Sequence, residues 1–196
     1  MHQIIPLAPQ GVFRTIQGEG SMTGVPMTFV RLAGCSVGCP QCDTDYSVSE
    51  RVEVNEIVRR CESFASDGYV FITGGEPTDH GSLLLDLIRK LAKFRVGIAT
   101  SGVRQFNFPI RSFVSCSPHS VNFKLRTFDE IKLVPGLNGL SLKDCDNIAT
   151  WPSVSSCLKR FMQPMDGDPI APCIEWVERH PGWRLSVQTH KVLGLP

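Results

Sequence analysis

Hydrophobic residues occur along this chain in short blocks that differ in their spacing. The segments Pro26–Ala33 (PMTFVRLA) and Tyr69–Thr73 (YVFIT) are compact apolar runs rich in β-branched and aromatic residues, which predicts buried strands. Similar short runs predict five further strands, at residues 96–100, 113–117, 130–134, 157–162 and 185–189.

Between these runs, apolar residues recur three or four positions apart, which is typical of helices that bury one face. Such spacing predicts three helices, over residues 54–64, 84–91 and 170–178, whereas residues 117–150 show only weak helical signals. Alternating strands and helices predict a parallel sheet. A complete eight-stranded barrel needs about 250 residues, and this chain has 196. We therefore expect an α/β fold, an incomplete TIM-type barrel with parallel strands and few helices, in one domain over residues 1–196.

Composition narrows the class of protein. Hydrophobic residues make up 42% of the chain, enough for a packed core, and the net charge of +1 gives no electrostatic reason to expect direct binding of nucleic acid. No apolar run approaches the ~20 residues of a membrane span. The N-terminal sequence MHQIIPLAPQ lacks the basic and apolar regions of a secretory signal. We therefore expect a cytoplasmic protein that does not bind membranes.

Three of the eight cysteines lie close together. Cys35, Cys39 and Cys42 form a C-x3-C-x2-C loop directly after a predicted strand. Such a loop allows three thiolates to bind one metal ion or cluster. A [4Fe–4S] cluster held by three cysteines has one iron without a cysteine ligand, called the open iron below. An open iron can chelate S-adenosylmethionine, which a cluster electron then cleaves to a 5′-deoxyadenosyl radical. The alternative is a zinc site of three Cys and one His. The scattered cysteines are typical of small buried side chains: Cys61, Cys116, Cys145, Cys157 and Cys173.

The cysteine loop resembles that of the radical S-adenosylmethionine superfamily. The segment TGGEP (residues 73–77) strengthens the resemblance, because in that superfamily the glycine pair at this strand end binds the amino group of S-adenosylmethionine. Taken alone, TGGEP would fit an ordinary turn. The two motifs together favour a cluster enzyme over that reading.

Four further segments resemble the 7-carboxy-7-deazaguanine synthases of this superfamily. They are RTIQGEG (14–20), CDT (42–44), QPMD (163–166) and QTHKVLGLP (188–196). The resemblance implies conversion of 6-carboxy-5,6,7,8-tetrahydropterin to 7-carboxy-7-deazaguanine with loss of ammonia, in 7-deazapurine (queuosine-type) biosynthesis. It also implies a [4Fe–4S] cluster, S-adenosylmethionine, Mg²⁺, an electron donor such as flavodoxin or ferredoxin, and a homodimer.

The resemblance assigns roles by position, and it assigns no catalytic side chain because the cofactor radical does the chemistry. It makes Cys35, Cys39 and Cys42 the cluster ligands and Thr44 the Mg²⁺ ligand. The implied substrate contacts are Ile16, Gln17, Gly18, Arg31, Thr73 and Pro196. The implied S-adenosylmethionine contacts are Gln41, Cys42, Asp43, Gly75, Ser117, Pro118, His119, Gln163, Pro164, Met165 and Asp166.

Physical chemistry supports some of these roles and leaves alternatives. The planar fork of Arg31 suits a substrate carboxylate, although a surface salt bridge would also explain it. The hydroxyl of Thr44 is a poor Mg²⁺ site by itself, so the substrate must supply other oxygens; a helix cap is the other reading. His190 is either a cavity residue or a structural histidine. The apolar end of the chain, VLGLP, is expected to pack inward.

This chain departs from the family pattern at Gln41, where the family often has an aromatic residue, and at His119, where it often has Lys.

Two other functions remain open at this point. One is an activase that makes a glycyl radical on a partner protein. The other is a zinc or iron–sulfur interaction module without catalysis.

Overall fold

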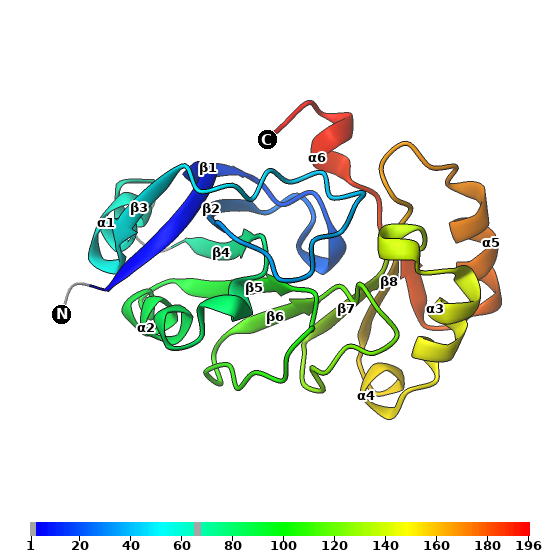
Figure 1. Cartoon of the computed structure of the whole chain (residues 1–196). Coiled ribbons are helices and arrows are strands. Elements are labelled where there is room, and N and C mark those ends of the chain that lie inside the picture. Colours follow the sequence, from blue (N-terminus) through cyan, green and yellow to red (C-terminus); the bar gives the residue numbers. More distant parts are fainter. Residues whose placement is uncertain (1–2, 65–67) are drawn as a thin grey trace.

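The computed structural model describes residues 3–64 and 68–196 (Figure 1). It contains a nine-stranded sheet in the order β3-β1-β2-β4-β5-β6-β7-β8-β9. The strands are β1 (Ile4–Ile16), β2 (Pro26–Leu32), β3 (Glu50–Glu53), β4 (Tyr69–Gly74), β5 (Arg95–Thr100), β6 (Phe113–Cys116), β7 (Glu130–Leu133), β8 (Lys159–Met162) and β9 (Trp183–Leu185). The α-helices are α1 (Val54–Phe64), α2 (Ser82–Lys90), α3 (Leu142–Ala149), α4 (Pro152–Ser155), α5 (Ala171–Arg179) and α6 (Thr189–Val192). Three short 3₁₀ helices are η1 (Gly20–Met22), η2 (Pro77–His80) and η3 (Leu137–Gly139).

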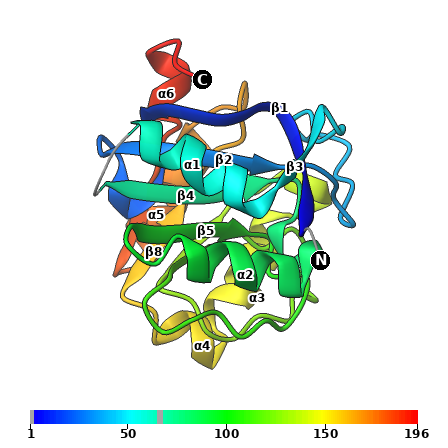
Figure 2. The same ribbon diagram turned by 90° about the vertical axis from the view of Figure 1, so that its left-hand side faces the viewer.

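The sheet confirms the expected incomplete barrel. β1 pairs antiparallel with β2 and β3, and every pair from β2–β4 to β8–β9 is parallel. β3 and β9 end the strand order, so the sheet is open. Helices α1 and α2 lie at one end of the molecule and α3 to α5 at the other, with the strands between them (Figure 1). Figure 2 shows α1 and α2 in front of the strands that they cover.

Alternation along the strands separates the core from the inner face of the sheet. In β2, Val30 and Leu32 are fully buried in the core under α1 and α2, whereas Met27 and Phe29 pack in a small cluster with Phe71. Arg31 continues the second set. Because successive side chains of a strand point to opposite faces, this register fixes Arg31 on the inner face, at the end of its strand.

The core consists of two large clusters in addition to the small cluster of Met27, Phe29 and Phe71. One contains residues from β1 to β5 with α1 and α2, and the other contains residues from β6 to β9 with α3, α4 and α5. Phe106 and Phe108, in the connection between β5 and β6, pack against both clusters and against each other, with ring centroids 4.7 Å apart. An aromatic pair therefore fills the place where a crossover helix would otherwise lie.

Strands β1 and β3 were not predicted. β1 is thirteen residues long and changes register between Leu7 and Val12, where Gln10 and Gly11 have positive φ. The prolines and this bulge interrupt the hydrophobic alternation that would have indicated a strand. Helix α3 was missed too, although Ser141 and Asp144 form a capping box at its start.

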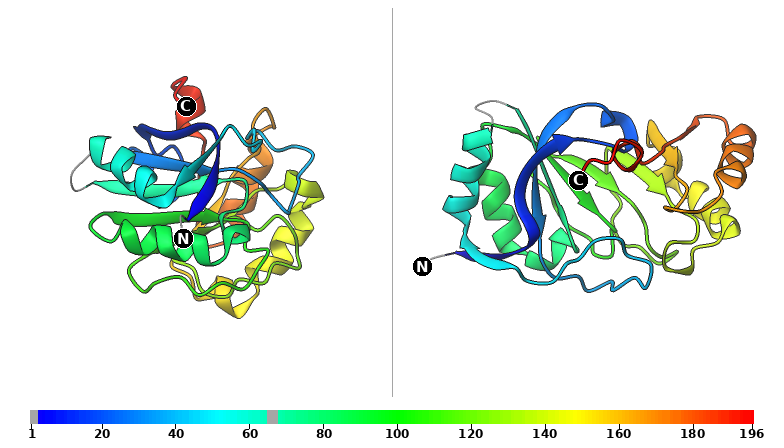
Figure 3. Two further views of the ribbon diagram at one scale, coloured as in Figure 1. Left: turned by 60° about the vertical axis from the view of Figure 1, so that its left-hand side comes forward. Right: turned by 90° about the horizontal axis from the view of Figure 1, so that it is seen from above.

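The expected strand at 185–189 is wrong. β9 ends at Leu185, and Thr189 begins the short helix α6, which lies over the middle of the molecule when it is seen from above (Figure 3). The expectation that VLGLP packs inward is wrong for Val192 and Leu193, whose exposed fractions are 82% and 59%. Leu195 and Pro196 do line the cavity described below. Among the described residues, no helix has the length and apolar character needed to cross a membrane.

Candidate active site

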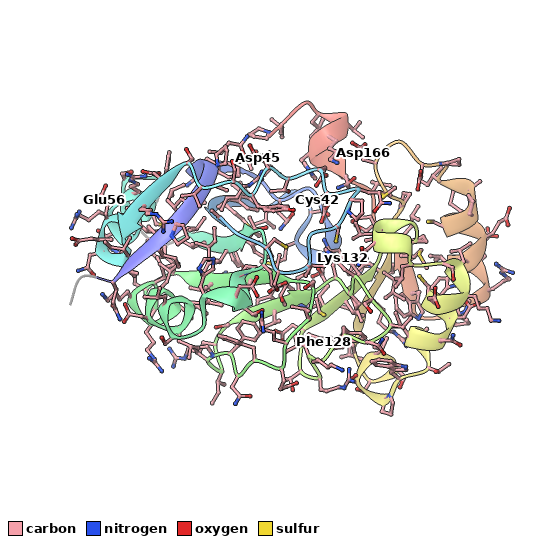
Figure 4. All side chains as sticks on the ribbon, in the orientation of Figure 1. Cys42, Asp45, Glu56, Phe128, Lys132 and Asp166 are labelled. Atoms are coloured by element: carbon pink, nitrogen blue, oxygen red, sulfur yellow. The ribbon has the colours of Figure 1, made fainter. Side chains whose placement is uncertain are left out.

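A cavity of about 630 Å³ lies at the carboxyl ends of the parallel strands. Ligands of open parallel sheets and of barrels bind at this end, because the loops that follow the strands converge there. Every residue to which the resemblance assigned a role lines this cavity except Pro118, which is buried and is not part of its wall. Figure 4 labels Cys42, Lys132 and Asp166, three lining residues that come from the cysteine loop, from β7 and from the segment after β8.

The three clustered cysteines share this cavity. Cys39 is buried, Cys35 is half-buried and Cys42 is exposed. Burial and the neighbouring cysteines raise the pKa of the Cys39 thiol to about 11. In the described part of the chain the other cysteines are buried in the two core clusters, and no three His, Cys, Asp or Glu side chains surround a single ion position. A set of three thiols around a cavity, with no fourth, fits a four-iron cluster with one open iron.

Hydrogen bonds fix the cysteine loop to the segment after β4. The backbone N–H and hydroxyl of Ser36 donate to Asp79 at 2.7 and 2.8 Å, and Arg104 Nε donates to the same carboxylate at 2.9 Å. The N–H of Glu76 donates to the carbonyl of Gly34 at 3.0 Å. Neither Asp79 nor Arg104 was singled out from the sequence, because no local motif marks a contact between loops this far apart.

Gly75 has to be glycine for a steric reason. A Cβ on Gly75 would lie 1.8 Å from the carbonyl oxygen of Gly34. The adjacent carboxylate of Glu76 is buried and accepts hydrogen bonds from Thr78, Thr100 and Ser101, five in all. This network holds the strand end of β4 against that of β5 and leaves the glycine backbone facing the cavity.

Arg31 has the surroundings expected of a residue that binds an anion. Its Cζ lies 5.2 Å from the ring centroid of Phe13, and its register partner in β4 is Thr73. Its Nε is buried and has no hydrogen-bond partner among residues 3–64 and 68–196. Burial lowers the pKa of Arg31, and Asp43 and Cys42 oppose that change. A buried donor without a partner is costly, so the guanidinium favours a ligand that supplies acceptor oxygens.

Each of the last three residues of the QGEG segment (residues 17–20) packs closely against another part of the chain. A Cβ on Gly18 would lie 2.1 Å from His190 Nδ1, and a Cβ on Gly20 would lie 2.3 Å from Glu130 Oε1. Between them, Glu19 forms an ion pair with Lys132. In the sequence, only the glycines indicated that this segment is special. The structure explains them, because the close packing leaves no room for a side chain at these positions.

Glu19 and Lys132 are functional-site residues that the sequence analysis missed. Glu19 also accepts hydrogen bonds from Gln163 Nε2 at 3.1 Å and Gln188 Nε2 at 2.9 Å. Burial raises the pKa of Glu19, but the charge and hydrogen bond of Lys132, together with Gln188, outweigh burial and lower this pKa to about 2. In the sequence, Glu19 lies within the RTIQGEG segment without an assigned role, and Lys132 is a polar residue between Ile131 and Leu133 in a predicted strand.

The carboxyl-terminal segment closes one side of the cavity. The N–H of Thr189 donates to the carbonyl of Gly18 at 2.9 Å. Lys191 forms ion pairs with Asp43 of the cysteine loop and with Asp166, the latter at 3.0 Å. These contacts connect α6 to two of the segments that the resemblance assigned to S-adenosylmethionine.

Two further predicted residues, Thr44 and His119, each contact a residue of the cysteine loop. The hydroxyl of Thr44 donates to Asp43 Oδ1 at 3.4 Å and faces the cavity. His119 lies with its Nδ1 3.1 Å from Cys39 Sγ. Burial is the largest of the effects that lower the pKa of His119.

This chain is similar to known proteins in both sequence and structure. The profile described as the radical SAM superfamily matches residues 29–144. A 7-carboxy-7-deazaguanine synthase from Bacteroides thetaiotaomicron is 32% identical over 94% of this chain and 96% of its own length. A protein of the same name from Escherichia coli K12 is 33% identical over 94% and 96%. The crystal structure of QueE from Escherichia coli superimposes with a TM-score of 0.75 at 28% identity, covering 96% of each chain.

Proposed function

Because this chain belongs to the radical S-adenosylmethionine superfamily and, within it, to the 7-carboxy-7-deazaguanine synthases, we propose that its cavity converts 6-carboxy-5,6,7,8-tetrahydropterin to 7-carboxy-7-deazaguanine with loss of ammonia. The observation that carries this proposal is the position of Arg31. Arg31, whose buried Nε has no hydrogen-bond partner in the described part of the chain, lines the same cavity as Cys35, Cys39 and Cys42. A carboxylate-binding group and a cluster loop thus face one space.

The chain's own residues bind and orient the reactants. When bound, the cluster and S-adenosylmethionine supply the one-electron chemistry that starts the ring contraction. Cys35, Cys39 and Cys42 would hold the cluster, and Gly75, whose lack of a side chain lets it pack against Gly34, would offer backbone groups to the cofactor. The rest of the cavity wall proposed to contact S-adenosylmethionine includes Ser117, His119 and the segment 163–166.

Arg31 orients the substrate through its carboxylate. A guanidinium fork makes two parallel hydrogen bonds to a carboxylate, which fixes the plane of the acid as well as its position. The ring of Phe13 packs against the guanidinium and limits its rotation. Ile16, Gln17, Gly18, Thr73 and Pro196 complete the substrate contacts of the proposal.

Mg²⁺ forms part of the same proposal, with Thr44 as its protein ligand. Hard cations take oxygen ligands, and Mg²⁺ often binds one or two protein groups plus substrate and water. Replacement of Thr44 by Val removes the oxygen but keeps the shape of the side chain. We expect turnover of Thr44→Val to fall at least ~10-fold, about 1.4 kcal/mol, and to lose its response to added Mg²⁺. A variant as responsive to Mg²⁺ as the parent would make Thr44 a structural residue only.

Anaerobic incubation tests the reaction itself. Reconstituted protein is supplied with a reductant, S-adenosylmethionine and 6-carboxy-5,6,7,8-tetrahydropterin, and the product is analysed by mass spectrometry. We expect 7-carboxy-7-deazaguanine to form. Cleavage of S-adenosylmethionine that requires a partner protein instead of the pterin would support the glycyl radical activase.

The proposal includes an electron donor of the flavodoxin or ferredoxin type, a homodimer and a cytoplasmic location. The family resemblance supports these three features. Sedimentation of the purified protein tests the dimer, and turnover with each donor in place of a chemical reductant tests the electron source.

A further inference from the structure

His119 contacts a cluster ligand in this chain. Its Nδ1 lies 3.1 Å from Cys39 Sγ, which is within hydrogen-bond distance for a sulfur acceptor. Cys39 is the buried member of the three cysteines, with an exposed fraction of 7%. The thiol of Cys42, by contrast, is exposed and donates a hydrogen bond to the carbonyl of Thr44, within its own loop, at 3.5 Å. The three thiols thus differ in their surroundings, and the contact with His119 distinguishes Cys39.

The backbone around His119 is fixed independently of the cysteine loop. Directly after β6, the N–H of Ser117 donates to the carbonyl of Thr100 at 2.8 Å. Pro118 restricts the backbone between Ser117 and His119. The carbonyl of His119 accepts a hydrogen bond from Asn138 Nδ2 at 3.0 Å. Asn138 itself has a left-handed conformation, with φ of 50°, which asparagine tolerates better than most residues. The imidazole is therefore held against Cys39 by contacts on two other segments.

A thiolate that binds iron can only accept a hydrogen bond, so the proton between these two atoms belongs to the imidazole. An imidazole can carry a proton on Nδ1 whether or not the ring is charged. Hydrogen bonds to the sulfurs of an iron–sulfur cluster are one of the means by which a protein tunes its reduction potential. A donor stabilises the more negatively charged, reduced cluster more than the oxidised one, and so it raises the potential.

We propose that His119 donates a hydrogen bond from Nδ1 to the Cys39 thiolate and thereby raises the reduction potential of the cluster, in addition to lining the cofactor site. This inference rests on the proposed cluster at Cys35, Cys39 and Cys42. It gives a role to His119, one of the two residues noted above as departures from the family pattern. His119 is in this sense a positioning residue, because it acts through Cys39.

Two substitutions distinguish the effect of the hydrogen-bond donor from the effect of the aromatic ring. His119→Phe keeps a planar ring but has no donor, and His119→Asn places an amide N–H near the position of Nδ1. The midpoint potential of the reconstituted protein is measured by EPR-monitored redox titration without S-adenosylmethionine. We expect His119→Phe to lower the potential by about 59 mV, which corresponds to a tenfold weaker preference for the reduced state of a one-electron couple. We expect His119→Asn to stay close to the parent.

Three outcomes are distinguishable. A His119→Phe protein with a full cluster and the parent's potential would overturn the inference. If that variant instead only weakens S-adenosylmethionine binding, His119 contacts the cofactor alone, which also overturns it. Absence of any cluster in the reconstituted parent would contradict the proposed function itself.

A measurement on the parent covers the case in which His119→Phe cannot assemble its cluster. Protein labelled with ¹⁵N-histidine is reduced and examined by electron–nuclear double resonance. We expect a weak ¹⁵N coupling to the reduced cluster. The absence of such a coupling would overturn the inference without the need for any variant.

Discussion

Glu19 and Lys132, which are 113 positions apart in the sequence, form an ion pair inside the cavity, where Lys132 is 10% and Glu19 19% exposed. The pair joins the QGEG segment to β7. It also brings together two opposite charges whose side chains are largely withdrawn from solvent, so that each charge is stabilised by the other.

Removal of one partner should destabilise the protein more than removal of both. We expect Lys132→Met to lower the free energy of unfolding by ~3–5 kcal/mol, because it leaves a buried carboxylate without its cation. The double variant Glu19→Gln/Lys132→Met should recover part of this loss. Urea denaturation of the four proteins in a double-mutant cycle measures the coupling. Additive losses would mean that the two charges do not interact.

The same pair predicts a dependence of stability on pH. The pKa of Glu19 is lowered from 4.5 to about 2, so the folded state favours the ionised form. A lowered pKa contributes stability above the unfolded value and loses it as pH falls toward the folded value. The free energy of unfolding of the cluster-free protein should therefore fall between pH 4.5 and about 2, and Glu19→Gln should show a smaller fall. Equal pH dependence in both proteins would exclude Glu19 as the cause.

Cluster assembly should depend on three cysteines only. We expect Cys35→Ala, Cys39→Ala and Cys42→Ala each to abolish the cluster, which in the parent carries about four irons per chain. Cys157→Ala is the matched control, because Cys157 lies in the second core cluster and not in the cavity wall. Iron analysis and visible absorbance after anaerobic reconstitution measure the result. Loss of the cluster in Cys157→Ala would contradict the open-iron assignment.

Arg31→Lys should separate substrate binding from cofactor binding. Lysine keeps the charge but lacks the planar fork that binds a carboxylate through two hydrogen bonds. We expect the pterin to bind less tightly by ~2–5 kcal/mol, with cluster content and S-adenosylmethionine binding unchanged. Equilibrium binding of each ligand measures the two effects. Unchanged pterin affinity would remove Arg31 from the substrate site.

Sequence reasoning was most successful where chemistry and strand periodicity coincided. The cysteine loop and TGGEP each follow a strand with a clear hydrophobic pattern, so their positions at one end of a parallel sheet were predictable. Arg31 was predictable for the same reason, because alternation in β2 determines the face on which it lies.

The missed features depend on contacts between distant segments. Lys132 is an isolated polar residue in a short strand until β7 is aligned beside β6 and β8. β1 contains a bulge that interrupts its pattern. The strand expected at 185–189 overlaps β9 only at Leu185, and α6 begins at its last residue, Thr189. Local propensity gives little information in such cases, because tertiary packing decides the outcome.

The two large hydrophobic clusters are joined along β5 and β6 and by the aromatic pair Phe106 and Phe108. We expect each cluster with its strands and helices to open as a separate cooperative unit. The cavity extends across this junction, with Gly75 on one side and Gln163 on the other. A ligand that touches both sides therefore links two units that otherwise unfold with separate free energies. By mass action such a ligand slows amide hydrogen exchange in both units at once, including strands that it never contacts.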